Sequence, residues 1–297
     1  MWTDIQIFGF RALWSPYFFL SIVCIGLIYY FWLVRHKDED KRPKQKQPLF
    51  FYLGLLLLYI LKGSPIDLMS HIMFTAHMIQ MALLFLLFPI AIIKGLTVLI
   101  LEKIFNAPIL KHVLKLLTKP LISLLMFNML FSFYHLPAIF DFTKENEVVH
   151  ISATVILVLA AFIMWWPIFS PIKEMNRMQP LLKIGYIAAS GVLITPACAL
   201  IIFSSTSPSA TYGAEGSWLQ AMALCVPLDV LDTITISGPE MFSPIGLLED
   251  QQLGGIVMKI TQELIYASMI GRIFFPWFRK DEYKIDPLPV EQPTNEF

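Results

Sequence analysis

The feature that most limits how this chain can fold is a series of apolar segments, each about 20 residues long and nearly free of charge. A helix of about 20 residues crosses the hydrocarbon core of a bilayer, which is about 30 Å thick. The composition agrees, because 57% of the 297 residues are hydrophobic and 15% are charged, whereas a soluble domain has about 25% charged residues. We therefore predict an all-α polytopic membrane helix bundle with seven transmembrane helices, at about 13–34, 49–66, 72–93, 120–139, 148–169, 181–204 and 256–276.

Lysine and arginine are unevenly distributed between the two sides of this bundle. Of the 22 Lys and Arg residues, 18 fall in 35–48, in 94–119, in 170–183 and from Arg272 onward, which are alternate connections. Positive residues accumulate in cytoplasmic loops. We therefore predict the N-terminus outside and the C-terminus in the cytoplasm, an arrangement that requires an odd number of spans. The N-terminus lacks the basic start of a secretory signal, so the first apolar run is expected to be retained.

The connections complete a single integral membrane domain, 1–297, in which we find no internal repeat and no separate soluble domain. On the outer side, 205–255 is long and rich in Gly, Pro and Ser, and its part 218–230 is apolar enough to pack on the bilayer surface. On the inner side, 94–119 alternates Lys with apolar residues at helical spacing, which predicts a basic amphipathic helix on the membrane surface. The remainder, 277–297, is a cytoplasmic tail.

Several classes of function have no support in the sequence. Basic and acidic residues number 22 each, so no net charge indicates nucleic-acid binding. The three cysteines lie far apart and form neither a disulfide framework nor a zinc motif. We also find no nucleophile elbow, phosphate-binding glycine loop or H-E-x-x-H pattern. The protein is therefore predicted not to be an enzyme.

The stretch from His71 to Met81 opens the third predicted span and carries an unusual set of side chains. At helical spacing Met73, His77 and Met81 share one face, with Gln80 beside them. An imidazole between two thioethers is a soft, neutral donor set that suits Cu(I) better than hard cations. Methionines at this spacing also pack in apolar cores, and that alternative stays open.

Four of the six histidines fall at the outer face of the predicted bundle. His71 and His77 lie at the outer end of the third span, His135 at that of the fourth, and His150 opens the fifth. His135 can instead cap its helix, and His150 can pair with neighbouring glutamates. Ionisable residues inside spans are functional candidates, because burying them unpaired is costly. The candidate metal ligands are His77, Met81, Met73, His71, His135 and His150.

Two further polar groups lie near the last span. Lys259 and Glu263 are four residues apart, which predicts an ion pair on one helix face. Glu249 and Asp250 precede the span on its outer side. Their carboxylates are interpreted either as support for a metal site or as a docking surface. Near the end of the second span, Lys62-Gly63-Ser64-Pro65 predicts a break in the helix.

Four short motifs follow one another between residues 50 and 275. They are His77-Met78-Ile-Gln80 with Leu83-Leu84 and Pro89; Tyr134-His135-Leu-Pro137-Ala with Asn146 and Val149-His150; Trp165-Trp166-Pro167; and Asp250-Gln251-Gln252-Leu253-Gly254-Gly255. In kind and order they resemble the motifs of the polytopic CtaG family of cytochrome c oxidase assembly factors, which serve caa-type oxidases. Met81 and Thr154 stand where many relatives carry a second histidine.

The resemblance implies a multi-pass protein of a bacterial plasma membrane that is required for active cytochrome c oxidase. It implies that the protein helps copper to reach an oxidase copper centre, with oxidase subunits, the lipid bilayer and a copper donor protein as partners and no nucleic acid. Our hypothesis is transient Cu(I) binding at the outer face. Three alternatives remain: a metal-free scaffold for oxidase subunits, a haem-binding membrane oxidoreductase with histidine axial ligands, and a copper transporter.

Overall fold

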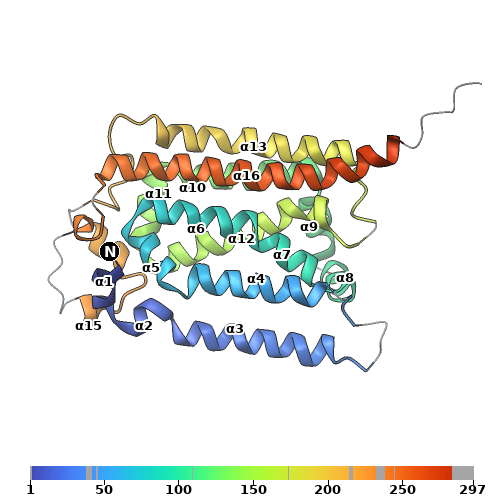
Figure 1. Ribbon diagram of the computed structural model, residues 1–297, viewed down its shortest axis with the longest axis horizontal. Helices are drawn as coiled ribbons and strands as arrows, with labels where there is room; N and C mark the ends of the chain where they lie inside the picture. The colour runs from blue at the N-terminus through green and yellow to red at the C-terminus, as the bar shows by residue number, and fades with distance from the viewer. Residues whose placement is uncertain are drawn as a thin grey trace, which may run out of the picture.

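A computed structural model describes residues 2–37, 42–44, 46–108, 110–172, 174–213, 217–231, 238–243 and 245–282. Within these ranges all regular elements are helices and no strand occurs, so the all-α prediction is confirmed. The long helices run side by side in an elongated bundle (Figure 1). Lys41, Lys173, parts of the predicted outer segment (214–216, 232–237 and 244) and 283–297 of the predicted tail lie outside the described residues.

Helices of very different lengths make up the bundle. In chain order they are α1 Trp2–Ile5, η1 Gln6–Phe8, α2 Gly9–Trp14, α3 Pro16–Tyr29, η2 Tyr30–Val34, α4 Gln47–Lys62, α5 Pro65–Ile72, α6 Phe74–Leu86, α7 Phe88–Gly95, α8 Val98–Asn106, α9 Leu110–Leu117, α10 Pro120–Tyr134, α11 Pro137–Glu145, α12 Glu147–Phe169, α13 Pro180–Ile202, α14 Ser217–Met222, α15 Leu228–Leu231, η4 Pro239–Met241 and α16 Leu247–Glu282.

Proline sets where many of these helices begin. Its fixed φ suits the first turn of a helix, where no backbone N–H is needed for an intrahelical bond. Proline also keeps the preceding residue out of the helical region, so it separates successive helices. Five α-helices start with it, at Pro16, Pro65, Pro120, Pro137 and Pro180.

Four helical stretches among the described residues are long and apolar enough to cross a membrane. They are Gln6–Val34, Phe74–Gly95, Glu147–Phe169 and Pro180–Ile202. Two further pairs qualify only when each is taken as one bent span: α4 with α5, bent by 44°, and α9 with α10, bent by 82°. The described chain thus has four to six candidate spans. The seventh span, and the sides on which the termini lie, remain predictions.

The seventh predicted span, 256–276, falls inside α16, a helix of 36 residues that lies along α13 (Figure 1). The charged side chain of Lys259, near the middle of α16, has several polar partners. Lys259 forms the expected ion pair with Glu263 at 2.7 Å. Its ammonium also donates to the Gly191 carbonyl oxygen and the Thr195 hydroxyl, at 3.2 and 3.0 Å. These bonds join α16 to the middle of α13.

Two of the predicted helices are interrupted. The chain from 71 to 81 is not one helix, because Met73 has extended backbone angles (φ −126°, ψ 134°) between α5 and α6. The fourth predicted span, 120–139, ends at Tyr134, since Pro137 starts the separate helix α11. The break expected at Lys62-Gly63-Ser64-Pro65 is present between α4 and α5.

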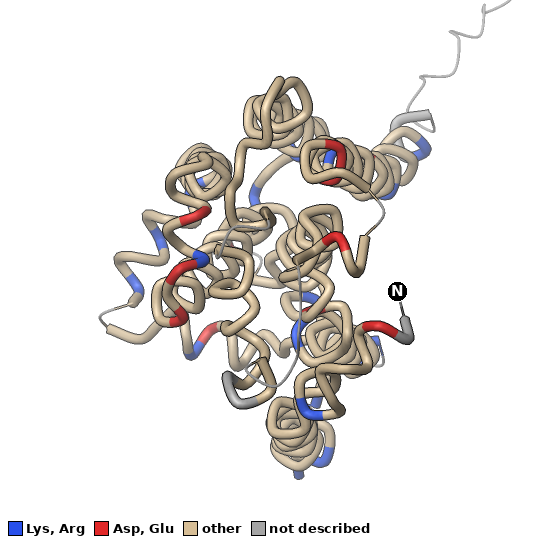
Figure 2. The backbone as a smooth tube through the Cα atoms, turned by 90° about the vertical axis from the view of Figure 1, so that its left-hand side faces the viewer, with Lys and Arg blue, Asp and Glu red and all other residues tan. Residues whose placement is uncertain are grey.

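One end of the bundle is closed by the N-terminal helices α1 and α2 together with part of the segment 205–255 (Figure 1). Trp218, Met222 and Val226 pack there with Ile5 and Phe8 in a buried cluster. Acidic residues mark several loops and helix ends on this face (Figure 2). The apolar residues around 218 therefore pack against the protein itself. The described chain begins at this end, whereas α16 finishes at the opposite end (Figure 1).

Candidate functional site

Four helices bring the four candidate histidines to the closed end of the bundle. His71 lies in α5, His77 in α6 and His150 in α12, while His135 follows the last residue of α10. All four are buried, with His77 only 1% exposed and His150 the most exposed at 8%. The sequence placed these histidines at the same face of the bundle, and the structure also places them at one end of it.

Local hydrogen bonds fix the starts of the helices that carry these histidines. The Ser64 hydroxyl accepts from the backbone N–H of Ile66 at the start of α5. The Asn146 side-chain oxygen accepts from the N–H groups of Val148 and Val149 at the start of α12. Such caps satisfy amide groups that the first turn leaves without partners. Each of them sets the register of the histidine one or two turns further on.

The cap of α6 comes from a distant part of the chain. The Asp250 carboxylate of α16 accepts from the N–H of Phe74 at 2.6 Å and from that of Thr75 at 3.3 Å. The Thr75 hydroxyl donates to the Asp250 carbonyl oxygen at 2.9 Å. Asp250 thus caps and supports the helix that holds His77.

The histidines are arranged as two pairs. The ring centroids of His71 and His150 are 5.6 Å apart, and those of His77 and His135 are 6.3 Å apart. The Phe140 ring lies against the second pair, 5.2 Å from His77 and 6.2 Å from His135. His77 is within electrostatic range of the other three histidines. The four rings thus form one neighbourhood without stacking into a single cluster.

Several ring nitrogens in this neighbourhood are buried and have no hydrogen-bond partner. They are both nitrogens of His77, Nδ1 of His71, Nδ1 of His150 and Nε2 of His135. The Nδ1–H of His135 donates to the Phe131 carbonyl oxygen at 2.8 Å, which leaves its Nε2 with a free lone pair. A buried polar group without a partner costs about 1–3 kcal/mol. Unpartnered imidazole nitrogens are therefore a reason to look for a ligand here.

A buried lysine that belongs to none of the sequence motifs lies beside these rings. Lys144 of α11 is 2% exposed, and its ammonium lies 5.7 Å from the centre of the Phe140 ring. Burial, together with nearby Lys62, lowers the pKa of Lys144 to about 7 against the opposing effects of Asp67 and Cys225. Near neutral pH the lysine can therefore be uncharged, which reduces its repulsion of a bound cation.

A polar group from α4, α5 and α6 lies close to Lys144. Lys62 and Asp67 form an ion pair at 2.5 Å. The Gln80 amide donates to the Asp67 carboxylate at 2.8 Å and to the Leu61 carbonyl oxygen. Gln80 therefore ties α6 to the bend between α4 and α5. Sequence patterns placed Gln80 beside His77 but gave no sign of its partners.

The two candidate methionines face different parts of the molecule. Met73 lies at the junction of α5 and α6 and packs beside the cluster that closes the end of the bundle. Met81, one turn after His77 in α6, is 2% exposed within the main apolar core. The prediction that both flank His77 on one continuous helix face is wrong for Met73, because the helix is broken at that residue.

Part of the segment 205–255 covers this region. The Tyr212 hydroxyl donates to the Ser70 carbonyl oxygen at 2.8 Å. Asp141 of α11 holds the same loop through the hydroxyls of Ser209 and Thr211, at 2.5 and 2.7 Å. Gln220 of α14 donates to the Glu145 carbonyl oxygen at 3.2 Å. The covering loop and α14 are therefore bonded to the helices that carry His71 and precede His150.

The arrangement provides imidazole pairs and no larger ligand group. Within the described ranges, no three or more His, Cys, Asp or Glu side chains are placed together so that they could hold a metal ion. Two neutral imidazoles, or an imidazole with a thioether, are donors that suit Cu(I). The free nitrogens are therefore chemically suited to a soft cation held by few ligands.

These observations define a class of protein: a helical membrane protein with a covered, buried histidine site at one end of its bundle. The chain belongs to the cytochrome c oxidase caa3 assembly factor family (Caa3_CtaG), whose family model matches residues 27–280. The match includes all four site histidines and confirms the resemblance that the sequence motifs indicated. Comparison with curated proteins and with solved structures gave no match.

Proposed function

We propose that this member of the oxidase assembly family carries Cu(I) as cargo for cytochrome c oxidase, at the end of the bundle where the four histidines lie. The observation that supports the proposal best is the set of buried imidazole nitrogens without hydrogen-bond partners, contributed by separate helices. Most buried polar groups have partners. A cluster of neutral nitrogen donors in an apolar surrounding is suited to a soft monovalent cation.

Within this proposal the residues have different roles. His77 and His135 form the main donor pair, and Met81 is the nearest thioether along α6. His71 and His150 form a second pair that receives or passes on the ion. Two-donor sites bind less tightly than sites closed by four ligands, and such sites suit a protein that has to release its cargo.

Lys144 gives the site a dependence on pH. Its charged form repels a cation, and its pKa is lowered to about 7 by burial. Histidine ligands also need their neutral form. Cu(I) binding therefore weakens as the pH falls from 7 to 5 because Lys144 becomes charged, while the buried imidazoles and the Met81 thioether remain as donors.

Two of the alternative functions are less well supported by the packing. A haem between axial histidines needs an open slot for the porphyrin, and Phe140 occupies the space beside the His77 and His135 pair. A transporter needs a polar path through the bundle, whereas Met78, Phe85 and Met258 below the site are buried apolar residues of the core. A metal-free scaffold for oxidase subunits remains the main rival.

The proposal is tested with His77→Ala and a matched control, His112→Ala, whose side chain is exposed on α9. Purified proteins are titrated with Cu(I) against a competing chelator at pH 7 and pH 5. Membranes from cells that make each variant are assayed for oxidase activity and oxidase copper, with the amount of each protein measured. We expect His77→Ala to weaken Cu(I) binding at least tenfold and to lower oxidase copper, while His112→Ala leaves both unchanged.

The rival function predicts a different result. Full oxidase copper with normal amounts of the His77→Ala protein would mean that the histidines are structural and that the protein acts as a scaffold. Equal Cu(I) affinity at pH 7 and pH 5 would mean that the charge on Lys144 does not act on the copper site.

A further inference from the structure

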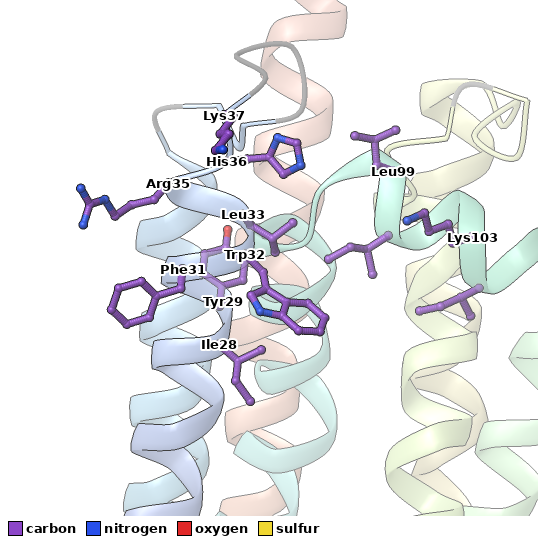
Figure 3. A pocket seen from close by; sticks show the side chains of 12 residues that line it. Ile28, Tyr29, Phe31, Trp32, Leu33, Arg35, His36, Lys37, Leu99 and Lys103 are labelled. Atoms are coloured by element: carbon purple, nitrogen blue, oxygen red, sulfur yellow. The ribbon is translucent and has the colours of Figure 1, made fainter.

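A separate groove lies at the opposite end of the bundle from the histidines. It has a volume of about 840 Å³ and runs between the end of α3 with η2 and the helix α8. Figure 3 shows Trp32 pointing from η2 into the space before α8, while Lys103 on α8 points back toward it. Sites for small molecules have volumes of roughly 300–1,000 Å³. The groove is therefore large enough for a ligand.

Hydrogen bonds and a ring contact between α3, α4 and α7 fix the positions of the helices that border the groove. The Tyr29 hydroxyl donates to the Gly95 carbonyl oxygen at 2.8 Å, and its ring stacks on Phe51 with centroids 3.8 Å apart. The Gln47 amide donates to the Leu96 carbonyl oxygen at 3.2 Å. These contacts fix the end of α3 and the end of α7 against α4. The chain then turns away into α8 and leaves the groove between α8 and η2.

The groove is apolar along its length. Ile28 and Trp32 on one side are 55% and 75% exposed, and Leu99 and Ile104 on the other are 36% and 44% exposed. The last turn on the first side is a π-helix, in which the N–H of Arg35 donates to the Tyr30 carbonyl oxygen at 2.9 Å. Such turns often occur at functional sites. Here the π-helix forms the wall that carries Trp32.

The rim of the groove is basic. Arg35, His36 and Lys37 follow the candidate span Gln6–Val34 directly, and Lys103 lies on the opposite wall. In Figure 3 the Arg35 side chain extends on the far side of η2, Lys37 lies above the end of η2, and the His36 ring extends toward α8. Lys37 and Lys103 are the two lysines that line the groove. Cations at the end of a span lie at the level where phospholipid head groups begin. The apolar walls below them lie at the level of the acyl chains.

We propose that this groove binds one anionic phospholipid, with an acyl chain along Trp32 and Leu99 and its phosphate between Lys37 and Lys103. The order of groups along the groove, apolar and then cationic, matches the order along such a lipid. Basic pockets between membrane helices are known to bind anionic head groups. A bound lipid joins α3 to α8 and fills a space at the boundary of the bundle that no described side chain occupies.

The test uses the full-length protein, purified and stripped of lipid, and native mass spectrometry with phosphatidylglycerol or with phosphatidylcholine of the same acyl chains. The variant Lys37→Gln/Lys103→Gln removes two charges from the rim. The control Lys111→Gln/Lys115→Gln removes two charges from the exposed face of α9. A lysine near an anionic lipid contributes about a fivefold change in affinity. We expect phosphatidylglycerol to bind about 25-fold more weakly to the rim variant and with a much smaller loss to the control, whose lysines lie on a surface helix outside the groove.

A second variant examines the apolar wall. Trp32→Ala removes an exposed ring and is not expected to disturb the core, so the protein should stay folded. We expect it to weaken binding of both lipids. Equal binding of the two lipids to the native protein would overturn the proposal, and so would equal losses in the rim and control variants. Dimers in place of lipid adducts would assign the groove to a second copy of the chain.

Discussion

The strongest prediction concerns the buried Lys144. Its pKa is 10.5 in an exposed lysine and about 7 in the folded protein, because the ammonium is removed from water and faces Lys62. Between pH 7 and pH 10.5 the unfolded chain therefore holds a proton on this lysine that the folded protein does not. Folding stability rises with pH wherever the unfolded state binds more protons. The stability of the native protein should thus increase as the pH is raised through this window.

The size of the effect follows from the two pKa values. Below pH 7 the lysine is protonated in both states, and the lowering of its pKa from 10.5 to about 7 makes folding less favourable by nearly the full amount of about 5 kcal/mol. Between pH 6 and pH 9 the free energy of unfolding should rise by about 3 kcal/mol. In a chain of this length that corresponds to a Tm change of about 6 °C.

The experiment compares the native protein with Lys144→Met, which keeps a long apolar side chain and removes the amine. Thermal unfolding in one detergent is followed at several values between pH 6 and pH 9. Groups shared by both proteins cancel in the difference. We expect Lys144→Met to be the more stable protein at pH 6 and the difference to shrink toward pH 9. Lys111→Met on the exposed face of α9 should follow the native curve.

Parallel Tm curves for the native protein and Lys144→Met would refute the reasoning. Such a result would mean that the lysine keeps its charge through hydration or through a tighter pairing with Asp67. The same outcome would remove Lys144 from the account of how Cu(I) binding depends on pH.

Two further predictions concern the positioning of helices. Asp250→Ala removes the cap of α6 and should cost about 1–2 kcal/mol, seen as a Tm several degrees below that of Glu249→Ala, whose side chain is exposed; equal Tm values would contradict a capping role. Gly95→Ala would place its Cβ 2.5 Å from the backbone N of Phe51 and should destabilise the protein by more than about 2 kcal/mol, whereas Gly185→Ala meets nothing within 4 Å and should be neutral or slightly stabilising. Equal unfolding midpoints for the two alanine variants would show that α4 and α7 can move apart at no cost.

The positions of the main helices could be predicted because hydrophobic length is a local property. The predicted span 148–169 corresponds to Glu147–Phe169, and 181–204 corresponds to Pro180–Ile202. The helix breaks were harder to place. Pro65 allowed the break after α4 to be predicted. No proline or glycine lies at the break at Met73, so that break could not be predicted in the same way. It depends on Asp250, which is far away in sequence and accepts the N–H groups at the start of α6.

The candidate site was also predicted only in part from the sequence. Histidine positions along the chain predicted that His71, His77, His135 and His150 lie at one end of the bundle. The sequence did not indicate which histidines form pairs or that Phe140 lies against one of the pairs. It also gave no sign that Lys144 is buried, since no local pattern distinguishes a buried lysine from an exposed one. The sequence likewise gave no sign that Asp141 accepts hydrogen bonds from the covering loop.

The sequence by itself determined the all-helical membrane class, the family, and the end of the bundle at which the histidines gather. These depend on composition, on segment length and on residue order, which are properties of contiguous stretches of chain. Only the tertiary structure decided the pairing of the histidines, the burial of Lys144 and the groove between η2 and α8. These depend on contacts between residues far apart in sequence, and such contacts follow from how the helices bend and pack against one another.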